Sequence, residues 1–223
     1  MDLLWENKWQ GEKMNEKITF LKENDHILGM FIDIVGELKI SRRKDHYVSL
    51  VSSIIGQQLS VKASETISRR FLELLDGRVT PERVIGLSEQ ELRVIGISHP
   101  KMNYIKDLSE KVMQNEVNLD TLTTLGNNEV LAILTSVKGI GQWTAEMFLI
   151  FSLGRENVLS MLDVGLQRGA KWLYNSEDGK KTMVEKGQFW GPYSSIASLY
   201  LWEVVNRGYI TKYRSFEAFL KST

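Results

Sequence analysis

Residues 131–169, LAILTSVKGIGQWTAEMFLIFSLGRENVLSMLDVGLQRG, contain a glycine turn and an aspartate on which the predicted fold and function depend. They predict a helix, a tight turn with glycines at 139 and 141, a second helix, a loop, and a third helix that follows Asp163. Glycine lets a partner approach the bare backbone, and the amides that open a helix lie at the positive end of its dipole. The turn could therefore bind an anion such as a DNA phosphate, although a plain helix C-cap has the same pattern.

Asp163 also has two interpretations. It precedes a helix predicted over residues 164–174, where an aspartate side chain ordinarily caps the first backbone amides. Alternatively, its carboxylate does chemistry on a nucleotide that the turn holds. The aspartate alone favours the cap, so the choice depends on the rest of the chain.

Composition narrows the possible functions. The chain has no cysteine, which excludes disulfides, cysteine-bound zinc and iron–sulfur clusters. Its 28 basic and 28 acidic side chains give a net charge of zero, which counts against indiscriminate nucleic-acid binding but permits binding through backbone amides and a local basic patch. His26, His46 and His99 are scattered, without the spacing of metal ligands.

No segment suggests a membrane protein. The longest apolar run, residues 147–151, is far too short to cross a bilayer, and the amino terminus lacks the apolar centre of a signal peptide. We expect a soluble, cytoplasmic protein.

Almost every segment predicts a helix. Pro81, Pro100 and Pro192 fall near predicted helix starts, and Ser60, Ser88 and Ser98 are expected N-caps, Ser88 in a capping box with Glu91. Short helices on short connections predict an all-α fold of orthogonally packed helices. The charged residues 39–45 could separate two lobes.

The motifs resemble a known family. LTSVKGIGQWTAEM, residues 134–147, resembles the helix–hairpin–helix motif of DNA-binding proteins, and with the loop and Asp163 it resembles the helix–hairpin–helix DNA glycosylase superfamily. Other blocks are similar to the 3-methyladenine DNA glycosylase II family. They are YVSLVSSIIGQQLSVKA (47–63), GIS (96–98) with Lys101 and YIKDL (104–108), and WGPYSSIA (190–197) with YLW (200–202). The resemblance covers about residues 45–205.

The resemblance implies two helical lobes with an interlobe cleft. Residues 1–44 and 155–223 would form the lobe that carries Asp163, and residues 45–154 the central lobe, with the helix–hairpin–helix at about 131–152. The chain looks like a short form that lacks the amino-terminal sheet domain of the bacterial enzyme after which the family is named. We also expect a monomer.

The resemblance also assigns roles. Asp163 would be catalytic, stabilising the oxocarbenium-like sugar and helping to orient or deprotonate water. The base pocket would contain Trp143, Trp202, Met147, Trp190 and Tyr193, although the tryptophans could instead belong to the core. The DNA-binding hairpin would contain Val137, Lys138, Gly139, Ile140, Gly141, Gln142 and Thr144. The wedge that fills the gap of a flipped base would be Gln58, Leu59 or Gln57, unless this segment is a plain helix end with Leu59 in the core.

Two further expectations concern chemistry. Trp143 occupies the position where relatives that also cut the backbone carry a Schiff-base lysine, so we expect a monofunctional enzyme. No cofactor is expected to be required. Backbone carbonyls of Thr135, Val137 and Ile140 would hold a structural Na⁺ or K⁺ at the hairpin.

The leading hypothesis is hydrolysis of alkylated purines, such as 3-methyladenine or 7-methylguanine, from duplex DNA in the nucleoid, leaving an abasic site. A non-catalytic helix–hairpin–helix protein that binds DNA or lesions is the alternative, as is a glycosylase for a different lesion. An all-α domain without any DNA function is the simplest competitor.

Overall fold

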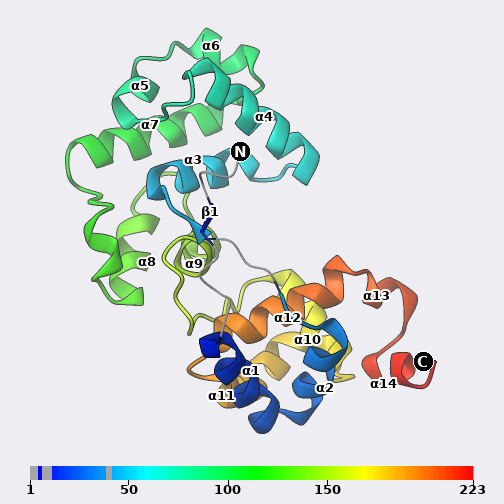
Figure 1. Cartoon of the computed structure of the whole chain (residues 1–223). Coiled ribbons are helices and arrows are strands. Elements are labelled where there is room, and N and C mark those ends of the chain that lie inside the picture. The colour runs from blue at the N-terminus through cyan, green and yellow to red at the C-terminus, as the bar shows by residue number, and fades with distance from the viewer. Residues whose placement is uncertain (1–4, 7–11, 39–41, 223) are drawn as a thin grey trace. The chain divides into compact units, whose positions relative to one another are not determined.

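A computed structural model describes residues 5–6, 12–38 and 42–222. The chain divides into two compact units (Figure 1). Unit 1 comprises Arg43–Leu153 with Trp5, and unit 2 comprises Glu6–Arg42 and Gly154–Thr223.

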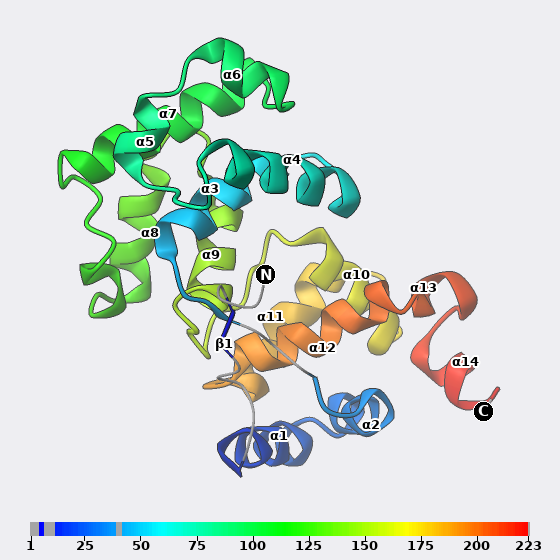
Figure 2. The same cartoon turned by 45° about the horizontal axis from the view of Figure 1, so that its top comes forward.

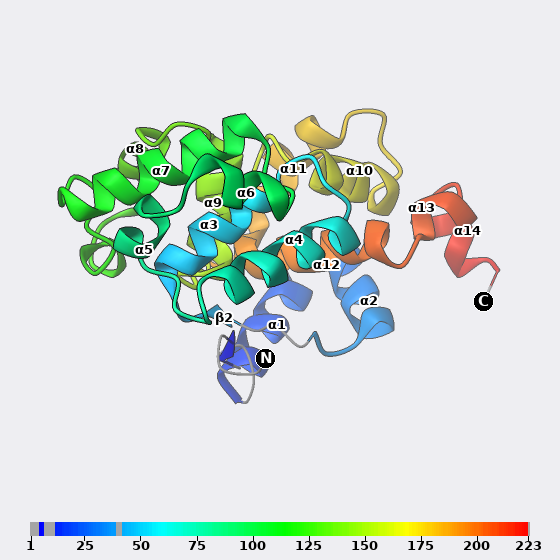
Figure 3. The ribbon, with the colours of Figure 1, turned by 90° about the horizontal axis from the view of Figure 1, so that it is seen from above.

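Unit 1 is built around α7, against which α3, α5 and α6 pack (Figure 3). Helix α3 also contacts α4 and α9, and α8 pairs with α9. The elements of this unit are α3 (His46–Gly56), α4 (Val61–Leu74), α5 (Pro81–Ile85), α6 (Glu89–Val94), α7 (His99–Met113), the 3-10 helix η2 (Thr121–Thr123), α8 (Asn127–Thr135) and α9 (Gln142–Phe151).

Local signals set where these helices start. The Ser60 hydroxyl accepts the N–H of Ala63 at the start of α4, and Ser88 forms the predicted capping box with Glu91 at the start of α6. Ser98 stands at the N-cap of α7 as predicted, although its side chain makes no capping hydrogen bond. Pro100 fits because it stands in the first turn of α7, where a missing N–H costs nothing.

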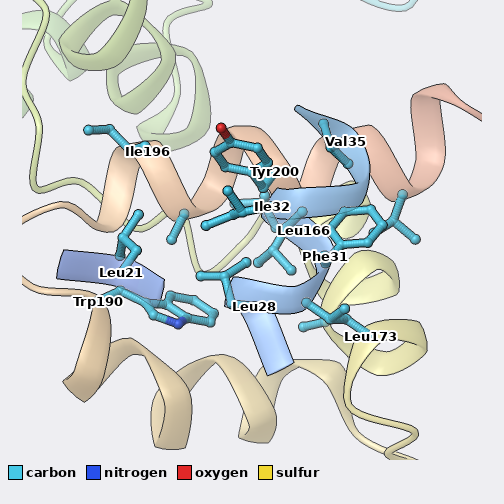
Figure 4. Packing of buried hydrophobic residues seen from close by; sticks show 14 of the residues in the cluster. Leu21, Leu28, Phe31, Ile32, Val35, Leu166, Leu173, Trp190, Ile196 and Tyr200 are labelled. Carbon is cyan, nitrogen blue, oxygen red and sulfur yellow. The ribbon is translucent and has the colours of Figure 1, made fainter. Parts of the chain in front are cut away.

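Unit 2 joins helices from both ends of the chain. They are α1 (Glu12–Asn24), α2 (His26–Val35), α10 (Val164–Leu173), α11 (Gly179–Trp190), α12 (Ser194–Asn206), α13 (Tyr209–Lys212) and α14 (Phe216–Leu220). The core brings together side chains of α1, α2, α10, α11 and α12, as Figure 4 shows around Phe31, Leu166 and Tyr200. Helices α10 and α12 lie side by side (Figure 2). A Cβ on Gly169 would lie 2.4 Å from the Leu201 carbonyl oxygen, so only glycine permits this approach.

The prediction of an all-α fold is confirmed. Among the described residues, the extended structure is limited to β1 (Trp5–Glu6) and β2 (Arg42–Arg43), which pair with each other. Within the same residues, no helix is both long and apolar enough to cross a bilayer.

Candidate active site and nucleic-acid interface

Asp163 is the N-cap of α10. Its Oδ1 accepts the backbone N–H of Leu166 at 2.7 Å, and only 6% of the residue is exposed. The capping role that the sequence suggested is therefore present. A buried carboxylate needs hydrogen-bond donors to offset the loss of water, and the helix start supplies one of them.

Trp202 supplies another donor from α12. Its indole Nε1 donates to Asp163 Oδ1 at 3.2 Å, and its ring is half-buried. Asp163 and Trp202, which the sequence placed in one site, are thus brought together inside unit 2. Two donors on the same oxygen fix the orientation of the carboxylate.

The loop before Asp163 is held by side chains of the neighbouring helices. The buried Ser195 hydroxyl donates to the carbonyl of Arg155 at 2.7 Å and accepts the N–H of Val158 at 2.9 Å. Gln167 Nε2 donates to the Met161 carbonyl at 2.8 Å. Asp163 therefore enters α10 from a fixed loop, which suits a group that must be preorganised.

Trp190 lies in the core of unit 2. It is 0% exposed within the cluster that Figure 4 shows. Its indole Nε1 donates to Asp25 Oδ2 at 3.0 Å. Its ring offers no face to a base in this structure, which agrees with the core interpretation. Tyr193 is half-buried, with its ring edge-on to Phe20 at 5.3 Å between centroids.

Asp25 was not singled out from the sequence, although it organises this core. Besides the Trp190 indole, its carboxylate accepts the Tyr174 hydroxyl at 2.5 Å and the N–H of Leu28 at 3.1 Å. Burial, followed by the charge of Asp25, raises the pKa of Tyr174. The only sequence signal was an aspartate ahead of the apolar residues 27–32, which predicts a cap but not its long-range partners.

The hairpin lies in unit 1. Helix α8 ends at Thr135 and α9 begins at Gln142. Gly139 has φ +80°, and a Cβ there would lie 2.2 Å from the Tyr104 ring. The turn thus requires glycine at 139 for both its conformation and its packing.

Gly141 has a different role. It is the N-cap of α9, has no side chain to occupy the first amides, and has no atom within 4 Å of the site of a Cβ. Two amides near Gly141 already make hydrogen bonds within the protein. The N–H of Lys138 donates to Asp107 Oδ2 at 2.9 Å, and that of Ile140 donates to the Val137 carbonyl at 3.1 Å. These two N–H groups are therefore engaged within the fold, and the position of Gly141 leaves open space at the start of α9.

The remaining hairpin residues differ in their exposure to solvent. Val137, Ile140 and Thr144 are buried, whereas Lys138, Gly141 and Gln142 are exposed. Trp143 is 46% exposed, and Met147 is half-buried on the same helix. Buried members support the turn, and exposed members can meet a ligand.

The candidate wedge residues differ in whether they contact the hairpin or are exposed to solvent. Gln57 Nε2 donates to the Gly139 carbonyl at 2.7 Å, so this side chain supports the hairpin. Gln58 is exposed with φ +58°, and Leu59 is 37% exposed rather than part of the core.

The cation site expected at the hairpin stays a prediction. Thr135, Val137 and Ile140 would offer backbone carbonyl oxygens, which suit hard cations. The Val137 carbonyl already accepts the N–H of Ile140 and keeps a second lone pair. Among the described residues, no group of three His, Cys, Asp or Glu side chains could hold a metal ion.

Comparison with known proteins gives the family. Residues 51–192 match the model of the HhH-GPD superfamily base excision DNA repair proteins. DNA-3-methyladenine glycosylase 1 of Schizosaccharomyces pombe is 28% identical, with 90% of this chain and 95% of that protein covered. The Bacillus subtilis protein YfjP is 33% identical, and the chain spans 58% of its length.

Solved structures agree. A crystal structure of DNA-3-methyladenine glycosidase from Bacillus halodurans has 42% identity and a TM-score of 0.84, and the match covers 92% of this chain and 95% of that one. The 3-methyladenine DNA glycosylase of Schizosaccharomyces pombe in complex with abasic DNA has 27% identity and a TM-score of 0.78, over 86% and 97%. The chain therefore belongs to the HhH-GPD superfamily of base excision DNA repair proteins.

Proposed function

We propose that this protein is a DNA glycosylase that hydrolyses the N-glycosidic bond of alkylated purines in duplex DNA and leaves an abasic site. One observation carries the proposal. The Asp163 carboxylate is held by the Leu166 amide and the Trp202 indole in a chain that belongs to a base excision repair superfamily. Relatives matched over nearly their whole length bear the name of 3-methyladenine glycosylases, which supports this substrate class.

Asp163 performs the chemistry electrostatically. As the glycosidic bond breaks, the deoxyribose gains positive charge, which a fixed carboxylate stabilises. The carboxylate also orients or deprotonates the attacking water. A purine alkylated at a ring nitrogen is cationic and leaves without being protonated, so no strong general acid is needed.

The hairpin binds the DNA backbone. Amides of Gly139, Gly141 and the start of α9 hold a phosphate at the positive end of the helix dipole. Such binding needs no basic surface, which agrees with a net charge of zero. Gln58 and Leu59, both exposed, fill the gap left by the flipped nucleotide.

Trp143 in unit 1 and Trp202 in unit 2 are each a candidate ring for stacking on the base. Met147 lies on the same helix as Trp143, and Tyr193 directly precedes the helix that carries Trp202. Trp143 has an exposed ring, and a desolvated cation over such a ring gains about 1–2 kcal/mol. Trp190 is not part of this proposed pocket because its ring is buried. Trp202 both faces the base and orients Asp163.

The enzyme is monofunctional in this proposal. Trp143 stands where a Schiff-base lysine would be required, and tryptophan has no amine to form one. Sodium borohydride should therefore trap no covalent protein–DNA complex during base release. A trapped complex would overturn this part of the proposal.

A lesion panel tests the substrate class. Duplexes that carry 7-methylguanine, 3-methyladenine, hypoxanthine, uracil or 8-oxoguanine are incubated with excess protein, and the released base is measured. We expect fast release of the cationic methylated purines. Preference for a neutral pyrimidine would indicate a glycosylase for a different lesion, and DNA binding without release of any base would indicate a non-catalytic binding protein.

A further inference from the structure

Three side chains on one face of α7 contact both DNA-facing segments of unit 1. Lys101, Tyr104 and Asp107 are spaced by three residues, so they project from the same side of the helix. One end of this row reaches the wedge loop, residues 57–60, and the other reaches the hairpin turn, residues 136–141.

Lys101 holds the wedge loop. Its ammonium group donates to the carbonyl of Ile55 and to that of Gln57, each at 2.7 Å. These carbonyls lie at the end of α3, where a cation also interacts favourably with the helix dipole. Desolvation lowers the pKa of Lys101, because partial burial disfavours the charged ammonium. The two hydrogen bonds to carbonyls offset this loss of hydration.

Tyr104 and Asp107 hold the hairpin turn. The Tyr104 ring packs against Gly139. The Asp107 carboxylate accepts the N–H of Lys138 at 2.9 Å and pairs with its ammonium at 3.1 Å. The side chain of Gln57 then links the two segments directly through the Gly139 carbonyl, at 2.7 Å.

We propose that Lys101 and Gln57 are positioning residues that lock the wedge loop to the hairpin turn, so that the wedge enters the duplex at a fixed distance from the phosphate that the hairpin holds. This inference rests on the proposed function. Flipping a base costs unpairing and unstacking, which the wedge offsets only if it reaches the gap. A loop that is hydrogen-bonded to the phosphate-binding turn is already positioned at the gap when the DNA binds.

The test compares excision from duplex and from single-stranded DNA, because a single-stranded base is already unstacked. The variants are Lys101→Met and Gln57→Glu, the second being similar in shape but unable to donate to the Gly139 carbonyl. Lys111→Met is the matched control, since Lys111 lies on the same helix and pairs with the exposed Glu116 at 3.1 Å. Lys101→Arg tests rescue, because a guanidinium can donate to both carbonyls.

We expect Lys101→Met and Gln57→Glu to slow single-turnover release of 7-methylguanine from duplex DNA by about 10- to 100-fold. Release from the single strand should stay near the wild-type rate, Lys101→Arg should recover most of the duplex activity, and Lys111→Met should match wild type. Equal losses on both substrates, or no loss on duplex DNA, would overturn the proposal.

A second readout is independent of base release. A duplex with a tetrahydrofuran abasic analogue next to 2-aminopurine is titrated to saturation, and the fluorescence increase reports unstacking by the wedge. The increase should be smaller for both variants than for wild type. An equal increase would contradict the positioning role, whether or not the protein excises any base, so failure of this inference is distinct from failure of the proposed activity.

Discussion

At the scale of single residues, the cap and the proposed catalyst are the same group. The carboxylate of Asp163 satisfies an amide of the first turn of α10 and accepts the Trp202 indole. The capping role of Asp163 was predictable from the sequence, because it depends only on the helix that directly follows this residue. Local pattern could not show that Trp190 is buried against Asp25 while Trp202 contacts Asp163, because such contacts join residues far apart in sequence.

Asp25 allows a stability prediction at this scale. Asp25→Ala removes the acceptor of the half-buried Tyr174 hydroxyl and of the buried Trp190 indole, as well as the α2 cap. We expect a loss of about 2–4 kcal/mol in the free energy of unfolding, measured in urea by fluorescence and circular dichroism. Asp178→Ala, which removes the exposed cap of α11, is the control and should cost only about 1 kcal/mol. Equal losses would show that Asp25 acts only as a cap.

At the scale of elements, helices with strong local signals were predictable. Ser60 and the Ser88–Glu91 capping box start helices as expected. The pairing of β1 with β2 was not predicted, because two residues per strand carry no periodicity. Lys101, Tyr104 and Asp107 lie in blocks that the family resemblance covers, but their contacts with two other segments follow only from tertiary structure.

The hairpin gives a paired prediction. Gly141→Val should cost at most about 1 kcal/mol of stability, because no atom lies within 4 Å of the new Cβ although valine is a poorer N-cap than glycine. It should weaken duplex binding by about tenfold or more, since the side chain would occupy the place of the phosphate. Gly139→Ala should instead destabilise the fold, because φ is +80° and the Tyr104 ring is in the way. Fluorescence anisotropy and thermal melting separate the two effects. Unchanged affinity in folded Gly141→Val would rule out this phosphate site.

At the scale of the whole molecule, unit 2 takes α1 and α2 from the amino-terminal part of the chain and α10–α14 from the carboxy-terminal part. Periodicity could predict these helices but not their association, which was expected only from the family resemblance. The net charge of zero is equally a property of the whole chain. It favours recognition through a few amide contacts over a broad electrostatic surface.

Salt dependence tests this view of binding. Because few phosphates are neutralised, log K for duplex DNA should fall with log salt with a slope of only about −2 to −4. Titrations at several salt concentrations measure this slope. Gly141→Val, which changes no charge, should lower the affinity without making the slope steeper. A slope of about −7 or steeper would indicate a basic surface instead.

Single-turnover release of 7-methylguanine by Asp163→Asn tests directly whether the Asp163 carboxylate is catalytic. Asparagine keeps an oxygen for the Leu166 amide and the Trp202 indole, so the fold should survive while the charge that stabilises the sugar is lost. Asp178→Asn, the same change at the exposed cap of α11, is the control. We expect at least about 100-fold slower release for Asp163→Asn and wild-type release for Asp178→Asn. Release by folded Asp163→Asn at the wild-type rate would contradict a catalytic role of Asp163.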